Sequence, residues 1–173
     1  SCIKGVFDIN GAKGPNKFGT DIISFNGTNF GFVCKDYELS DGTTVCVGNT
    51  VYAMGTDWNN GLNCNSSSAD YAGDEYCKFN YAASGYTNDR WAEVRKICLD
   101  QNADLPDKDT LQKLYDNKSN IPVLANWNST LFWSSTESGQ GNAWYVHDFD
   151  GCVTSITPKF DYDNTFRAIC VGK

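Results

Sequence analysis

The sequence has little of what a membrane-spanning or nucleic-acid-binding protein needs. No apolar run approaches the ~20 residues of a transmembrane helix. Lys and Arg together number 14 in 173 residues, no basic run exceeds two residues, and the formal net charge is −7. Neither nucleic acid nor an anionic membrane surface is therefore an expected partner. The single histidine, His147, also leaves little material for a Cys/His metal site.

Eight cysteines are the most informative feature that is present: Cys2, Cys34, Cys46, Cys64, Cys77, Cys98, Cys152 and Cys170. Their number is even and no two form a C-x-x-C pair, which favours disulfides made in an oxidising compartment over a zinc or redox site. The spacing does not choose among the pairings, but a Cys64–Cys77 bridge would close a short loop. We therefore predict a secreted or cell-surface protein.

The order of the predicted elements is that of a disulfide-rich α+β fold. Strands are predicted over 30–34 and 43–47, joined by a turn at 40–42, and then over 131–133, 143–146, 153–156 and 166–171. A long loop over 55–87 follows the first strands.

Two helices are predicted between the two groups of strands. The first covers 88–101, has Asn88 or Thr87 as its N-cap, and carries an apolar face that contains Trp91. The second begins at about Asp107, a residue suited to the N-cap position.

The second half of the chain carries an ordered set of motifs: Ala103-Asp104-Leu105-Pro106, Phe132-Trp133-Ser134-Ser135-Thr136-Glu137, Asn142-Ala143-Trp144-Tyr145-Val146, Asp150-Gly151 and Phe166-Arg167-Ala168-Ile169-Cys170. In this order they resemble bacterial C-type-lectin-like domains, such as the C-terminal domain of the Legionella collagen-like adhesin and the Fibrobacter major paralogous domains. The resemblance implies a C-type-lectin-like fold over 51–173, with two short helices, antiparallel strands and terminal strands that meet. It also implies a Cys98–Cys170 bridge from the first helix to the last strand.

A second set of motifs lies within residues 5–25: Asp8-x-Asn10-Gly11, Gly14-Pro15-Asn16-Lys17-x-Gly19 and Asp21-Ile22. It resembles a segment of type IV pilins and type II pseudopilins, which implies a small pilin-like β segment over 1–50. In that family a membrane-spanning helix precedes the segment. We expect that helix to be missing from this chain, and it would be the chain's route to the membrane.

Together, the two resemblances imply an extracellular type IV pilus subunit, a minor pilin or pilin-like protein of a Gram-negative bacterium, that acts in adhesion or filament assembly. Other pilin subunits and a glycan or protein ligand are the implied partners. Two alternatives stay open: a secreted lectin-like binding module with no role in a filament, and a major structural pilus subunit.

Calcium is the cofactor that the sequence brings into consideration. Asp8, Asn10 and Asp21 offer the carboxylate and amide oxygens that calcium prefers. The same side chains also fit Asx turns and local pairing, so both interpretations stay open. The Glu-Pro-Asn, Gln-Pro-Asp and Trp-Asn-Asp motifs of sugar-binding lectins do not occur, so calcium-dependent sugar binding of that kind is not expected.

Two tryptophans in polar loops are candidates for ligand contact. Trp58 is followed by Asn59 and Asn60, and Trp127 is followed by Asn128. Aromatic rings flanked by amides are used both in sugar stacking and in protein–protein hot spots. Local loop packing is the alternative interpretation.

We predict a binding protein rather than an enzyme. His147 and Asp148 are neighbours on a predicted strand, so alternation points their side chains to opposite faces. No Gly-x-Ser-x-Gly nucleophile elbow occurs either.

Overall fold

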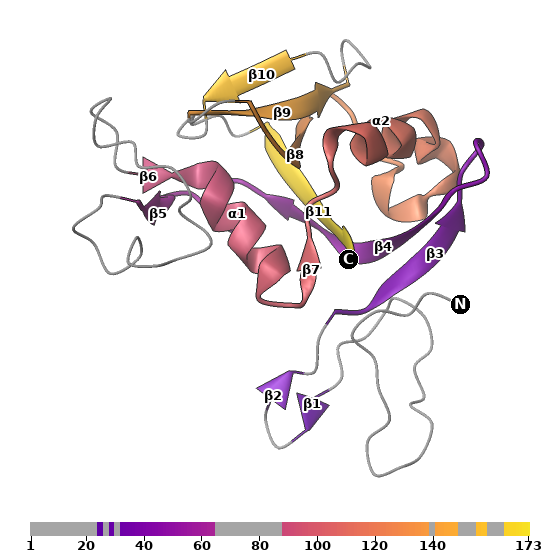
Figure 1. The fold of residues 1–173 in the computed structure, drawn as a ribbon, viewed down its shortest axis with the longest axis horizontal. Coiled ribbons are helices and arrows are strands. Elements are labelled where there is room, and N and C mark those ends of the chain that lie inside the picture. Colours follow the sequence, from indigo (N-terminus) through magenta and orange to yellow (C-terminus); the bar gives the residue numbers. More distant parts are fainter. Residues whose placement is uncertain are drawn as a thin grey trace.

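The computed structural model describes residues 24–25, 28–29, 32–64, 88–138, 141–148, 155–158 and 165–173. These residues form a mixed α+β structure in which two α-helices pack on a sheet of mainly antiparallel strands (Figure 1). The predicted α+β class is confirmed at this level. Among the described helices, none is long and apolar enough to cross a membrane.

The main sheet has the strand order β10-β9-β8-β11-β4-β3, and β7 pairs with the end of β11. In chain order these strands are β3 (Cys34–Glu38), β4 (Thr44–Ala53), β7 (Ala103–Asp104), β8 (Leu131–Ser138), β9 (Asn142–His147), β10 (Ser155–Pro158) and β11 (Phe166–Gly172). Neighbours are antiparallel except β8 and β11, which run parallel. The last strand therefore lies between an early strand of the chain and a late one.

Two short ladders lie outside the main sheet. One pairs β1 (Ser24–Phe25) with β2 (Thr28–Asn29), and the other pairs β5 (Leu62–Asn63) with β6 (Asn88–Asp89). The second ladder fixes the chain in an extended conformation directly before the first helix.

The first hairpin has the predicted turn, but its first strand lies further along the chain than expected. The turn at 40–42 is confirmed, whereas β3 begins at Cys34, and Phe32 and Val33, the other described residues of the strand predicted over 30–34, lie before it. Phe32 is buried before the strand, and its ring lies so close to Gly48 that a Cβ there would be 2.8 Å from the ring. This apolar side chain packs against the sheet instead of extending the strand.

The expected boundary between residues 50 and 51 falls inside β4. This strand pairs with β3 on one side and with β11 on the other. The hairpin is therefore part of the same sheet as the C-terminal strands.

The two helices lie close to their predicted positions. They are α1 (Arg90–Leu99) and α2 (Lys108–Asp116), and α2 is followed by the short 3-10 helices η2 (Lys118–Asn120) and η3 (Pro122–Leu124). Asp107 is the N-cap of α2, as predicted, and its carboxylate accepts a hydrogen bond from the Thr110 N–H.

The N-cap of α1 is Asp89 and neither Asn88 nor Thr87. Because Asn88 and Asp89 pair with β5, the chain stays extended for one residue longer than the pattern suggests. The Asp89 carboxylate then accepts the Ala92 N–H at 2.7 Å.

An Asp89→Ala variant is expected to lose about 1–2 kcal/mol of unfolding free energy, because the cap is buried and an N–H of the first turn loses its acceptor. Urea denaturation followed by far-UV circular dichroism measures this loss. Asp89→Asn keeps an acceptor oxygen and is the matched control, which should retain most of the stability. Equal losses in the two variants would contradict a capping role.

Asp41 ties the hairpin turn to α2. Its carboxylate accepts the Thr43 hydroxyl and N–H at 2.6 and 3.0 Å and forms an ion pair with Lys113 at 3.0 Å. The hydrogen bonds from Thr43, followed by the contact with Lys113, lower the pKa of this carboxyl below its ordinary value. The Ser40 N–H adds a hydrogen bond to the Asn117 side chain at 3.1 Å.

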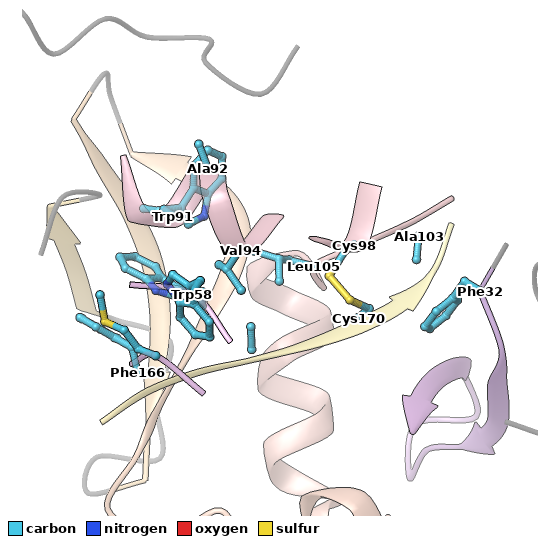
Figure 2. Close-up of a cluster of buried hydrophobic side chains, with 14 of the residues drawn as sticks. Phe32, Trp58, Trp91, Ala92, Val94, Cys98, Ala103, Leu105, Phe166 and Cys170 are labelled. Atoms are coloured by element: carbon cyan, nitrogen blue, oxygen red, sulfur yellow. A yellow bond between two sulfur atoms is a disulfide. The ribbon is translucent and has the colours of Figure 1, made fainter. Parts of the chain in front are cut away.

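Two hydrophobic clusters occupy the two faces of β11. Ala168 and Cys170 belong to the first cluster, which lies under α1, while Ile169 and Val171 belong to the second, which includes side chains of α2 and η3. Figure 2 shows the first cluster, in which Trp58, Trp91 and Phe166 gather with side chains of α1. Strand alternation on β11 thus builds both halves of the core.

The predicted bridge between Cys98 and Cys170 is present and joins α1 to β11, with 5.5 Å between the two Cα atoms (Figure 2). A second disulfide, Cys34–Cys46, crosses the first hairpin. Cys64 is also disulfide-bonded, and Cys77, its expected partner, lies outside the described residues. These bridges are consistent with a secreted or extracellular protein.

Candidate binding site

The two tryptophans expected to contact a ligand from polar loops are core residues. Trp58 is 3% exposed and Trp127 is 1% exposed, so neither ring forms a solvent-facing platform. They also belong to different core clusters and do not build one shared site. Their neighbours Asn59, Asn60 and Asn128 are exposed. In both loops the amide side chains are exposed while the neighbouring ring is buried in the core.

Trp127 packs between two other aromatic rings. Its ring centroid lies 5.0 Å from that of Tyr115, at an edge-on angle, and 4.1 Å from that of Phe132. Its indole N–H donates to the Thr130 carbonyl at 3.2 Å, which satisfies the polar atom that burial would otherwise leave without a partner. The ring therefore fixes the segment between η3 and β8 against the sheet.

Asp148 holds the loop that follows Trp127. Its carboxylate accepts the Ser129 N–H at 3.2 Å, and Ser129 has the left-handed φ of +50°. The Tyr115 hydroxyl donates a hydrogen bond to the backbone carbonyl of Asp148 at 3.1 Å. The Lys118 Nζ lies 3.7 Å from the Asp148 carboxylate. These contacts assign Asp148 a structural role in shaping the loop.

A pocket of about 260 Å³ lies beside Trp127. It is lined by residues of β4, η3, β8 and β11 and of the loop before β8, namely Val51, Val123, Leu124, Asn126, Trp127, Thr130, Phe132 and Arg167. Its floor is buried, since Leu124, Trp127 and Phe132 are almost fully covered, whereas Val51, Val123 and Arg167 are half-buried. Apolar and polar groups therefore share the surface of the pocket, and Asn126, Thr130 and Arg167 supply polar side chains.

A larger groove of about 610 Å³ lies at the N-terminal end of α2, beside Thr44–Cys46 and Val171–Lys173. The two carboxylates in its lining make structural contacts. Asp104 is held by Arg95 through two hydrogen bonds of 2.9 Å, and Asp107 caps α2. We therefore take the pocket beside Trp127 as the candidate binding site.

The predicted calcium ligands Asp8, Asn10 and Asp21 lie outside the described residues. Among the residues that are described, no three or more His, Cys, Asp or Glu side chains gather in a group that could hold a metal ion. The calcium interpretation stays a prediction.

The chain matches no protein-family model and no curated protein sequence.

Sequence reasoning named Trp127 among the residues that line this pocket and missed its charged residue, Arg167. It stands within the Phe166–Cys170 motif as a charged residue in an otherwise apolar strand. Alternation along β11 places it on the same face as Ile169 and Val171. A charge at a position where the strand pattern calls for an apolar side chain was the signal that could have identified it.

Proposed function

We propose that this chain is an extracellular binding domain with a C-type-lectin-like fold, carried by a type IV pilus subunit. The observation that carries the proposal is the Cys98–Cys170 bridge, which ties the first long helix to the last strand. The pairing of β4 with β11 adds support, because the resemblance implies terminal strands that meet. A pocket lined by apolar side chains together with Asn126, Thr130 and Arg167 is compatible with a binding role.

The filament half of the proposal depends on the pilin-like motifs within residues 5–25. In a pilus subunit this segment would contact other subunits, and the disulfide-rich domain would be displayed to a glycan or protein ligand on another surface. Calcium at Asp8, Asn10 and Asp21 is part of this proposal.

Filaments sheared from the cell surface provide the test. We expect the intact, disulfide-bonded chain in the purified filament fraction, in amounts well below that of the main subunit. Quantitative mass spectrometry under non-reducing conditions measures both. A chain found free in the culture medium and absent from filaments would instead favour a secreted module, and near-equal stoichiometry would favour a major subunit.

The lectin-like half has a separate test. The purified protein, applied to a glycan array with and without calcium, is expected to bind through its displayed domain. Binding that disappears when calcium is chelated would support a calcium site. Retention of binding under chelation would place recognition elsewhere in the domain.

A further inference from the structure

Trp144 differs from the other four tryptophans of the chain. Those four belong to the two hydrophobic clusters and are at most 3% exposed: Trp58, Trp91, Trp127 and Trp133. Trp144 lies on β9, is half-buried and belongs to neither cluster. It also lies outside the lining of the pocket beside Trp127. Trp144 is therefore the tryptophan that a ligand can reach from solvent.

The exposed area of Trp144 belongs to its side chain. The residue pairs with Ile156 of β10, and its carbonyl accepts a hydrogen bond from the Ser134 hydroxyl at 2.8 Å, so strands on both sides cover its backbone. Because side chains alternate along a strand, Trp144 lies on the same face of β9 as Val146, which belongs to the second hydrophobic cluster. The helix α2 packs beside β9 (Figure 1).

Lys108 of α2 lies over the Trp144 ring, with 4.7 Å between its Nζ and the ring centroid. This is a cation–π contact, and it holds the ring in one orientation. The Lys108 backbone N–H donates to the Thr136 hydroxyl at 2.9 Å, which fixes the first turn of α2 against β8. No ion pair joins the ammonium to an acidic residue of the described part of the chain. Its N–H groups are therefore open to a ligand.

Two further polar groups border the ring. Asn142 lies two residues before Trp144 on the same face of β9 and is half-buried. Its carboxamide offers two donors and an acceptor, and the indole N–H of Trp144 offers a donor. Neither group is hydrogen-bonded to another of the residues that the structure describes. Polar groups with unused hydrogen-bonding capacity thus surround an accessible aromatic ring.

We propose that Trp144 is the stacking platform of a glycan-binding site for a neutral sugar ring, bordered by Lys108 and Asn142. The C–H groups on one face of a pyranose pack on the indole, while hydroxyls at the sugar's edge bind the ammonium, the carboxamide and the indole N–H. This inference rests on the proposed binding function. It places the glycan contact on the surface of β9, outside the pocket beside Trp127.

The charges and polar groups around the ring favour a neutral sugar over other occupants. Asp107 and Asp109 flank Lys108 in the sequence, both are exposed, and the whole chain carries a formal net charge of −7. An acidic sugar attracted to the ammonium would be repelled by these carboxylates. An apolar protein surface would cover the donors beside the ring and leave them without partners.

Titration of the isotopically labelled, disulfide-bonded chain with methyl β-glucopyranoside, and separately with methyl β-galactopyranoside, tests the inference by NMR. The five tryptophans give five indole N–H signals, and Trp144→Phe identifies the signal of Trp144 by its loss. We expect this signal to shift with a dissociation constant of roughly 1–10 mM for at least one of the glycosides. The signals of the four core rings should change little. Sorbitol, which has hydroxyls but no rigid ring face, should leave all five signals in place.

Three variants separate stacking, hydrogen bonding and general charge, and the backbone amides of β9 report binding in each. Trp144→Ala removes the platform and should weaken binding at least about tenfold. Lys108→Met keeps an apolar side chain over the ring but removes the ammonium, and should weaken binding about threefold. Lys35→Met is the matched control, because Lys35 lies over the Tyr37 ring on β3 at 5.4 Å, and it should leave the affinity unchanged. The amide spectrum first shows that each variant is folded.

Three results would overturn the inference. An unchanged affinity in Trp144→Ala, or no shift of the Trp144 signal with either glycoside at about 50 mM, would remove the site. Methyl β-glucuronide is the anionic form of the same sugar, and binding at least about tenfold tighter than that of the glucoside would remove the neutral class. Binding on the glycan array together with a silent Trp144 signal would reject this site and keep the proposed function. The failure of one is thus distinguishable from the failure of the other.

Discussion

Replacing both Cys98 and Cys170 with alanine is expected to lower the free energy of unfolding by about 4 kcal/mol. The bridge joins residues 72 positions apart, so its loss releases a long loop in the unfolded chain. A domain of this kind has a total stability of about 5–15 kcal/mol. The variant should therefore unfold at a much lower urea concentration, which tryptophan fluorescence under non-reducing conditions would measure.

The hairpin bridge is the matched control for this measurement. Cys34 and Cys46 are buried like the first pair but are 12 positions apart. The chain-entropy relation then predicts a loss of about 3 kcal/mol for the double alanine variant, smaller than that for the long bridge. A hairpin variant that loses as much stability as the Cys98/Cys170 variant, or more, would show that loop length does not govern the stabilisation.

Elements that depend on local pattern could be predicted from the sequence. The apolar periodicity around Trp91 and the capping residue Asp107 located both helices, and Asp41 and Gly42 located the first turn. Local pattern did not show where β3 begins, because the apolar side chain of Phe32 is equally suited to a strand and to packing against Gly48. Tertiary contacts decided between the two.

The Cys98–Cys170 pairing came from the resemblance of the motifs, since the cysteine spacing by itself leaves the pairings open. The candidate pocket could not be predicted at all. Val51, Val123 and Arg167 are far apart in the chain and meet through the pairing of β4 with β11 and the return of η3 to the sheet. Strand order and register determine which of these side chains come into contact, and neither can be read from one sequence.

The tryptophans show why composition misleads in polar loops. Asparagines on both sides of Trp127 suggested an exposed ring, but in an irregular segment neighbouring side chains point in different directions. Exposed asparagine side chains therefore do not require the neighbouring tryptophan ring to be exposed. Burial of the Trp127 ring follows from its contacts with Tyr115 and Phe132, which come from other elements.

Replacing Trp127 with alanine is expected to cost about 3–5 kcal/mol of unfolding free energy, the range for removing a large aromatic side chain from a core. The ring is 1% exposed and touches aromatic partners on both sides. Its removal also frees the Thr130 carbonyl, which accepts the indole N–H. Urea denaturation monitored by far-UV circular dichroism measures the loss without relying on the deleted fluorophore.

Asn128→Ala is the control for this variant, because its side chain lies in the same loop and is exposed. It should change stability by no more than about 0.5 kcal/mol, the usual range for surface substitutions. A surface platform would give a different pattern: Trp127→Ala would then keep its stability and lose ligand affinity alone. The two variants together therefore decide whether the ring supports the pocket from the core or contacts a ligand from the surface.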